Sequence, residues 1–242
     1  MLRKTLSYVY RRTPVIFKEA YNSYGSVLKA LQFTYWHFLV RNHTHASIPD
    51  LLYLQQFIRQ LNDKNISGTI VECGSWKGGS AALMQKCASK LGWKNEIYVF
   101  DSFEGFPMPD NPDVDGLKAQ GIKDGKYDWI KADESDVVNA FKHLSIYDTN
   151  VKIVKGWFNV TTPKSPARNI VLLHCDGDLY ESTQSTLESF YHKVVSGGYI
   201  VSNDYGEIWI GAKKAFDEWI ALHCPQVRIE KVPGGGAFFR KP

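Results

Sequence analysis

The chain has 242 residues, of which 44% are hydrophobic and 14% aromatic. This is enough apolar material for a sizeable core, so the composition excludes a largely disordered protein. The formal net charge of +4 is mild beside the basic charge that nucleic-acid binders concentrate on one face, and we expect no nucleic-acid partner. The length fits one α/β domain with an added terminal piece.

Residues 1–45 are an aromatic-rich, basic N-terminal extension that we expect to be helical in places. Five basic residues come before the first acid of the chain: Arg3, Lys4, Arg11, Arg12 and Lys18. We interpret this excess as a solvated terminus, with an anionic substrate or a membrane surface as the alternative. The extension is expected to pack across the domain or against a partner subunit, which would allow a homo-oligomer. A lid over the active site is the other interpretation.

Short β-branched or aromatic runs alternate with helical patterns from residue 46 to residue 242. Asp50 is expected to cap the first helix, whose apolar positions across 51–61 keep helical spacing. The runs that predict strands are 69–73, 97–100, 151–154, 170–175, 199–202, 227–232 and 236–240. The patterns that predict helices are 81–91, 137–144, 186–195 and 212–220, with Gly92 and Gly197-Gly198 as helix ends.

Strands that alternate with helices indicate a parallel sheet with both faces covered. Only Pro233-Gly234-Gly235 separates the last two runs, which is too short for a parallel crossover. The predicted fold is therefore α/β: a doubly wound, mostly parallel seven-stranded sheet with a C-terminal antiparallel hairpin. Within this domain, residues 107–133 form a long segment rich in Asp, Gly, Pro and Lys, which we expect to be a substrate lid.

The cysteines and the apolar segments bear on the cellular location, for which we expect the cytoplasm. Cys73, Cys87, Cys175 and Cys224 show no paired spacing, as is typical of buried thiols in a reducing environment. The apolar stretch 27–40 is too short and too polar to span a bilayer, so we expect no transmembrane segment. The N-terminal residues lack the short apolar segment and the small-residue cleavage site of a secretory signal peptide. The cytoplasm is therefore the expected location.

The turn after the first predicted strand contains Glu72, Gly74 and Gly78 and opens a helix. Glycines there let the backbone turn sharply and approach a ligand, and the helix start offers free N–H groups. The spacing E-x-G-x-x-x-G differs from the dinucleotide fingerprint and suits a cationic or hydroxyl-bearing ligand, although tight turns also use glycine for structural reasons. Asp101 follows the second strand, where an acid can accept hydrogen bonds from both ribose hydroxyls or cap a turn. Together the two motifs favour a nucleoside cofactor.

Acidic residues follow two later strands. Asp176 and Asp178 come directly after the run 170–175, and Asn203-Asp204 follows the run 199–202. Because ligands bind beyond the carboxyl ends of parallel strands, these oxygens favour a divalent metal, with helix capping as the structural alternative. His174, just before the acids, is interpreted as a core residue rather than a base.

The ordered motifs resemble those of class I S-adenosylmethionine-dependent methyltransferases and, more narrowly, the macrocin O-methyltransferase family. The similarity covers roughly residues 50–242. It rests on VFDSFEGFP at 99–107, VKGWF at 154–158, Thr162-Pro163, DGDLYEST at 176–183 and NDYG at 203–206. Members of that family include metal-dependent enzymes that methylate sugar hydroxyls of antibiotics.

The resemblance implies site residues for a cofactor, a metal and a base. The implied contacts with S-adenosylmethionine are Glu72, Gly74, Ser75, Trp76, Gly78, Asp101, Ser102 and Trp157, the last near the adenine. Mg²⁺ would be bound by Asp176, Asn203 and Asp204, with Asp178 as a candidate base beside Asp176 in the catalytic set. Relatives usually carry two acids where this chain has Asn203-Asp204, so the site loses one negative charge.

The sequence thus predicts a magnesium-dependent O-methyltransferase that acts on a hydroxyl of a sugar or glycosylated molecule. Metal-assisted orientation and deprotonation of the hydroxyl would activate a poor nucleophile. Two alternatives stay open. One is a phenolic O-methyltransferase of the catechol type, and the other is a non-catalytic scaffold with a decayed metal site.

Overall fold

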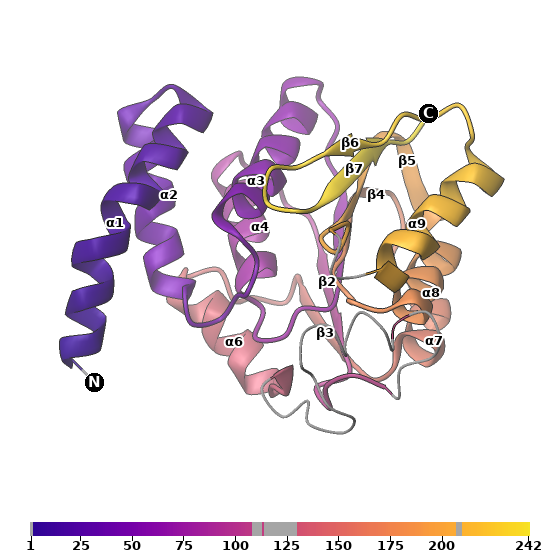
Figure 1. Ribbon diagram of the computed structural model, residues 1–242, viewed down its shortest axis with the longest axis horizontal. Helices are drawn as coiled ribbons and strands as arrows, with labels where there is room; N and C mark the ends of the chain where they lie inside the picture. Colours follow the sequence, from indigo (N-terminus) through magenta and orange to yellow (C-terminus); the bar gives the residue numbers. More distant parts are fainter. Residues whose placement is uncertain (1, 108–112, 114–129, 207–209) are drawn as a thin grey trace.

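The computed structural model describes residues 2–107, 113, 130–206 and 210–242. Its centre is a seven-stranded sheet in the order β3-β2-β1-β4-β5-β7-β6 (Figure 1). The strands are β1 (Thr69–Cys73), β2 (Ile97–Asp101), β3 (Val151–Lys155), β4 (Ile170–Cys175), β5 (Val194–Ser202), β6 (Glu230–Lys231) and β7 (Ala237–Arg240). The first five are parallel, whereas β7 runs antiparallel to β5 and to β6. The predicted fold is confirmed, and the strand order reverses between β1 and β4, where such sheets bind ligands.

Helices cover both faces of the sheet (Figure 1). One face carries α3 (Ile48–Asp63), α4 (Gly79–Lys90) and α6 (Glu134–His143). The other carries α7 (Phe158–Thr161), α8 (Tyr180–Phe190) and α9 (Ile210–His223), with the short 3-10 helices η2 (Thr162–Lys164) and η3 (Tyr191–Lys193). Successive strand residues point to opposite faces, so Tyr199 and Val201 enter one hydrophobic core while Ile200 enters the other.

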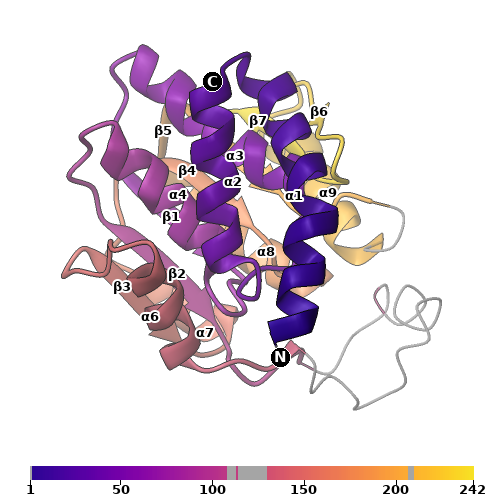
Figure 2. The ribbon, with the colours of Figure 1, turned by 90° about the vertical axis from the view of Figure 1, so that its left-hand side faces the viewer.

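The N-terminal extension is a helical hairpin of α1 (Leu2–Tyr24) and α2 (Val27–Val40). It packs on the outside of the layer formed by α3, α4 and α6 (Figure 2). Ser26 caps α2 by accepting the N–H of Lys29. None of the helices in the described part of the chain is both long and apolar enough to cross a membrane.

Several predicted element boundaries are wrong. The helix predicted over 186–195 is α8, which begins six residues earlier and ends at Phe190; the β-branched Val194 and Val195 belong to β5. Gly197-Gly198 therefore ends no helix. It lies in a stretch of β5 that bulges away from β4, since Val194 pairs with Ile170 but Tyr199 pairs with Leu172. Gly92, in contrast, follows the end of α4 with φ +84°, as predicted.

The start of α3 and the last strands also differ from expectation. The N-cap of α3 is Ser47, which accepts the N–H of Asp50, and Asp50 lies inside the first turn. Ser47 and Asp50, three residues apart, have the spacing of a capping box. The prediction considered only Asp50 and so assigned the cap to the wrong residue. The strand predicted over 227–232 is reduced to two residues, Glu230–Lys231.

The predicted lid over 107–133 falls mostly outside the described residues. Pro107 and residues 130–133 are described, as is Asp113, which is buried and accepts the N–H of Tyr180 at the start of α8 (3.0 Å).

Candidate active site

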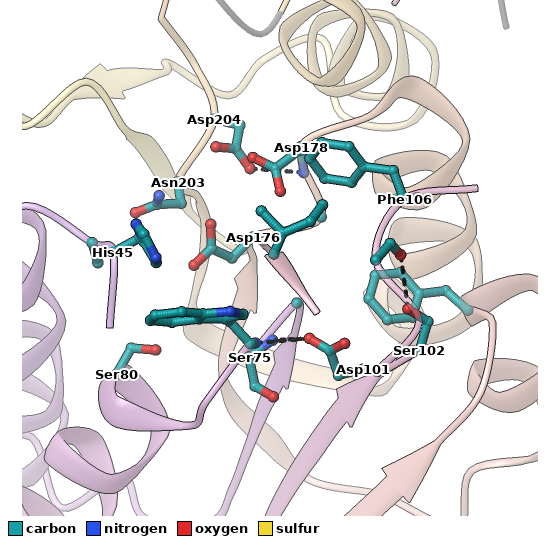
Figure 3. A pocket seen from close by; sticks show the side chains of 18 of the residues that line it. His45, Ser75, Ser80, Asp101, Ser102, Phe106, Asp176, Asp178, Asn203 and Asp204 are labelled. Atoms are coloured by element: carbon teal, nitrogen blue, oxygen red, sulfur yellow. Dashed lines mark hydrogen bonds between the residues drawn. The ribbon is translucent and has the colours of Figure 1, made fainter. Parts of the chain in front are cut away.

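A cavity of about 300 Å³ opens at the carboxyl ends of β1, β2, β4 and β5 (Figure 3). The turns after β1 and β2 form one wall, and the acidic turns after β4 and β5 form the facing wall. Ten of the predicted site residues line it: Gly74, Ser75, Trp76, Asp101, Ser102, Trp157, Asp176, Asp178, Asn203 and Asp204. The fold thus brings together segments more than 100 residues apart in the chain.

Asp101 holds the turn after β1 in place. Its Oδ2 accepts the N–H groups of Ser75 (2.9 Å) and Trp76 (2.7 Å), and its Oδ1 accepts that of Phe103 (2.8 Å). Trp76 has φ +47°, a left-handed conformation that costs a non-glycine residue free energy and needs such support. Each carboxylate oxygen accepts about two hydrogen bonds, and among the described residues Oδ1 accepts one, which leaves one position for a ligand hydroxyl.

Gly74 lets the two walls meet. Its φ is +94°, and an added Cβ would come within 1.7 Å of the carbonyl oxygen of Asp176. Glycine is therefore required both for its conformation and for the close approach of the backbone after β4.

Three polar atoms of the cavity residues are buried without a hydrogen-bond partner among the described residues: Ser75 Oγ, Trp76 Nε1 and Asn203 Oδ1. Buried polar groups are normally paired, and each one left unpaired costs free energy. They include both donors and an acceptor. The cavity is therefore built for a polar ligand that supplies both kinds of partner.

Asp176, Asp178 and Asp204 concentrate negative charge on the wall formed by β4 and β5. Burial raises the pKa of Asp176 and Asp178 well above the usual range, and the charge of Asp204 raises both further. Burial also raises the pKa of Asp204 to about 6, although its carboxylate accepts the N–H of Asp178 at 3.0 Å. Removing a cation from such a cluster leaves like charges in a poorly solvated place, so the cluster favours a bound cation.

The residues proposed for magnesium suit a hard cation. The unpaired Oδ1 of Asn203 is an oxygen ligand, and Asp176 and Asp204 supply carboxylates in the same cavity. Among the described residues, no three His, Cys, Asp or Glu side chains form a metal-binding group by themselves. The amide of Asn203 is thus needed to complete the predicted set.

Glu72 and Gly78, both predicted to contact the cofactor, do not line the cavity. Glu72 is fully buried in β1, and its Oε1 lies 2.9 Å from Nδ1 of His174, its in-register neighbour on β4. Burial lowers the pKa of His174, but the hydrogen bond with Glu72 and the nearby acids outweigh it and bring the pKa to about 9. Gly78 is the N-cap of α4 with φ +78°, and an added Cβ would meet Val137 of α6 at 2.8 Å.

The pair formed by Glu72 and His174 is consistent with the interpretation of His174 as a core residue. The positive charge of His174 lowers the pKa of Asp176 in the acid cluster, whereas the negative charge of Glu72 raises it. The pairing of Glu72 with His174 could have been predicted from the sequence. Each residue occupies the last position but one of its strand, and β1 and β4 are neighbours.

Several cavity residues were not predicted. They are Thr44, His45, Ala46, Ser80, Gly105, Phe106, Pro107, Ile130, Phe158, Gly177 and Ser182. Phe106, Pro107, Phe158, Gly177 and Ser182 lie within motifs that carried the family resemblance, so those motifs held the signal. His45 had no such signal: it comes from the connection between α2 and α3 and packs its ring against Trp76, with 4.0 Å between ring centroids. The four cysteines are free and buried, as predicted.

The mixed seven-stranded sheet, its antiparallel C-terminal hairpin and a cavity at the switch point define a class I methyltransferase. The chain belongs to the macrocin O-methyltransferase family, whose model, Macrocin-O-methyltransferase (TylF), matches residues 43–241. It is therefore an O-methyltransferase.

Similar proteins agree with this assignment. The chain is 32% identical over 180 residues to a demethyldecarbamoylnovobiocin O-methyltransferase from Streptomyces niveus, covering 74% of this chain and 68% of the relative. It is 29% identical over 203 residues to a tetracenomycin rhamnosyl 4'-O-methyltransferase from Streptomyces olivaceus, covering 82% and 75%. The solved structure of the O-methyltransferase NovP superposes with a TM-score of 0.74 at 28% identity over 82% of each chain. A calicheamicin methyltransferase shares the fold, with a TM-score of 0.65 at 20% identity over 96% and 91%.

Proposed function

We propose that this protein transfers a methyl group from S-adenosylmethionine to a hydroxyl of a sugar or of a glycosylated small molecule or glycan precursor. One observation carries the proposal: a single cavity joins the turn held by Asp101 to the acid cluster. A methyl donor and a hydroxyl acceptor must meet in one cavity for direct transfer. The names of two relatives, which give demethyldecarbamoylnovobiocin and a tetracenomycin rhamnoside as substrates, support this acceptor class.

The cofactor would lie along the wall formed by the turns after β1 and β2. Gly74 allows close approach of the backbone, Asp101 keeps one acceptor position for a ribose hydroxyl, and the unpaired Trp76 Nε1 and Ser75 Oγ supply further partners. S-adenosylmethionine supplies an electrophilic methyl group on a positively charged sulfur, and the acid-rich cavity favours that charge. A solved methyltransferase of the same fold contains S-adenosylhomocysteine, which supports this cofactor class.

Asp176, Asn203 and Asp204 would hold Mg²⁺. When bound, the ion would act as a Lewis acid that orients the acceptor hydroxyl and lowers its pKa. With two carboxylates and one amide, the site carries less charge than one with three carboxylates, so we expect weaker metal affinity and a greater contribution from acceptor oxygens.

Asp178 is the candidate base. Burial and the neighbouring Asp204 and Asp176 raise the pKa of its carboxyl, which makes the carboxylate a stronger proton acceptor. It would accept the hydroxyl proton as the hydroxyl oxygen bonds to the methyl carbon and the bond from that carbon to sulfur breaks, which leaves S-adenosylhomocysteine. The aromatic residues Trp157 and Phe158, which line the same cavity, would exclude water from the reacting atoms.

The first test is calorimetric titration with S-adenosylhomocysteine, in the presence of magnesium and then of EDTA. We expect micromolar binding in both cases, because the proposed metal ligands Asp176, Asn203 and Asp204 lie on the wall that faces the cofactor wall. An absence of binding in both would refute the proposed cofactor site.

Acceptor assays separate the two enzymatic alternatives. With S-adenosylmethionine and magnesium present, we expect methylation of rhamnosides or other glycosides, abolished by EDTA. Turnover of a catechol in place of every glycoside would instead assign a phenolic O-methyltransferase. The cytoplasm is the proposed compartment, because the four cysteines are free and buried, as is typical of a reducing environment.

A further inference from the structure

The N-terminal hairpin carries most of the exposed large apolar side chains of the described residues. Six of the ten lie on α1 and α2, within 21 residues of chain. We call this surface the hairpin face; it consists of Val15, Tyr21, Val27, Leu28, Leu31 and Tyr35. Apolar residues scattered singly need no explanation, but apolar residues that form a contiguous patch mark an interaction site.

On α2 the exposed apolar residues form one stripe. With about 100° of rotation per residue, Val27, Leu28, Leu31 and Tyr35 fall within an arc of about 100°. The residues that pack on the domain fall on the opposite side: Ala30, Phe33, Trp36 and Val40. A helix that is apolar on two sides is normally buried on both, yet the described part of the chain covers only one side of α2.

The hairpin is held firmly, so its orientation is fixed. Tyr24 donates to Oε1 of Gln55 (2.8 Å), and Gln56 donates to Ser23. Arg59 of α3 lies over the ring of Tyr24, 5.2 Å from its centroid. These contacts keep the domain side of the hairpin on α3 and leave the other side facing away from the sheet (Figure 2).

The charge of the hairpin indicates the partner. Residues 1–45 contain seven Lys and Arg but one acid, Glu19. Lys18 and Lys29 are exposed, Lys29 directly follows Leu28, and no acidic side chain is exposed among residues 13–40. An amphipathic surface with apolar and basic residues is typical of segments that lie in the interface of an anionic membrane.

A second copy of the chain fits this surface less well. Two hairpins meeting face to face would bring together the exposed Lys18 and Lys29 of each copy, with no exposed acid among residues 13–40 of either copy to offset them. Stable interfaces also need about 20–30 residues on each side, and this face offers six large apolar side chains.

We propose that the hairpin face docks in the plane of a membrane that contains anionic lipids. Leu28, Leu31 and Tyr35 would enter the headgroup region, and the exposed Lys18 and Lys29 would contact lipid phosphates. The helices would lie on the membrane rather than cross it, in agreement with their polarity.

The test is co-sedimentation of the full chain with vesicles of phosphatidylcholine, alone or mixed with phosphatidylglycerol. We expect binding to the anionic vesicles that weakens as salt increases. The variant L28S/L31S/Y35S should bind at least about 100-fold more weakly, because three apolar side chains lose their burial. The variant K18Q/K29Q should bind anionic vesicles about 30-fold more weakly.

A matched control is Leu222→Ser on α9, because Leu222 is 77% exposed and Leu28 is 78% exposed. Leu222→Ser should leave vesicle binding unchanged, and circular dichroism should show that all variants fold. The proposal is overturned if the wild-type protein ignores anionic vesicles or if L28S/L31S/Y35S binds as well as the wild type. It is also overturned if light scattering shows a wild-type dimer that L28S/L31S/Y35S dissociates, since the occupant is then a second copy.

Discussion

The α/β domain and the N-terminal hairpin depart from the usual distribution of side chains in opposite directions. The domain buries polar atoms of Ser75, Trp76 and Asn203 without a partner among the described residues. The hairpin exposes a face of apolar residues. Buried polar groups and exposed apolar patches both need a partner. The two regions therefore indicate two kinds of partner. The cavity suits a polar ligand, and the hairpin suits the proposed membrane with anionic lipids.

Charge separates the same two regions. Seven basic residues and one acid lie in residues 1–45, so the other 197 residues carry two more acids than bases. The net charge of +4 hides this division. A mild overall charge therefore says little about the partners of either region.

The largest expected effect is on catalysis at the polar cavity. Asp176→Ala should lower kcat by about 10³-fold or more, because several kcal/mol of metal-dependent stabilisation are lost. S-adenosylhomocysteine binding, measured by calorimetry, should stay within about threefold of the wild type. Asp63→Ala, which removes an exposed acid at the end of α3, is the control and should keep full activity. Full activity of Asp176→Ala would refute the metal site.

The next effect concerns the buried ion pair of Glu72 and His174. Glu72→Ala should lower the free energy of unfolding by about 3–5 kcal/mol, because it leaves His174 charged and buried without its partner. Urea denaturation measures this loss. Glu96→Ala breaks an exposed pair with Lys152 at 3.6 Å and should cost less than about 1 kcal/mol. Equal losses for the two variants would show that Glu72 and His174 are not paired in solution.

A smaller effect tests whether the hairpin belongs to the folded core. Burial, with a contribution from Arg41, lowers the pKa of His37 from 6.5 to about 4. Above pH 6.5, His37 is neutral in both the folded and the unfolded chain. As the pH falls toward 4, His37 binds a proton in the unfolded chain and not in the folded chain, so stability is lost.

The wild type should therefore lose about 3 kcal/mol relative to His37→Phe between pH 6.5 and pH 4. Thermal or urea unfolding of both proteins across this range measures the difference. Parallel pH profiles for the two proteins would mean that α2 is not packed on the domain at neutral pH.

The smallest effect is expected at the hairpin face. Leu28→Ser should change the free energy of unfolding by no more than about 0.5 kcal/mol, because the side chain is solvated in the folded state. Leu222→Ser should behave in the same way. A loss well above 1 kcal/mol for Leu28→Ser alone would show that the folded protein covers this face by itself.

The sequence predicted the sheet well because apolar runs end where strands end. The predicted limits of β1 and β4 match the structure, and those of β2 and β3 differ by one residue. Placement of the acids followed from the same rule, since Asp176 and Asn203 directly follow β4 and β5. The boundary between α8 and β5 was lost because apolar residues continue through it and periodicity cannot separate the two states.

Side-chain direction was harder to predict. Glu72 lies within β1, and the alternation of the strand points it toward His174 rather than into the cavity. His45 reaches the cavity from a loop that returns across α4, where Gly79 donates its N–H to the carbonyl oxygen of His43 (2.7 Å). No local pattern reports such a return of the chain.

Gly74 limits how this enzyme could be redesigned. Its missing side chain leaves room for the carbonyl oxygen of Asp176, 1.7 Å from where a Cβ would stand. The backbone N–H of Asp176 in turn donates to the carbonyl oxygen of Cys73 (2.8 Å). A mutant library that broadens acceptor choice can vary His45 or Phe106, but it should keep codon 74 fixed. Any larger residue there would displace the cofactor wall and the acid wall together, and the screen would discard the clone before a new acceptor could be detected.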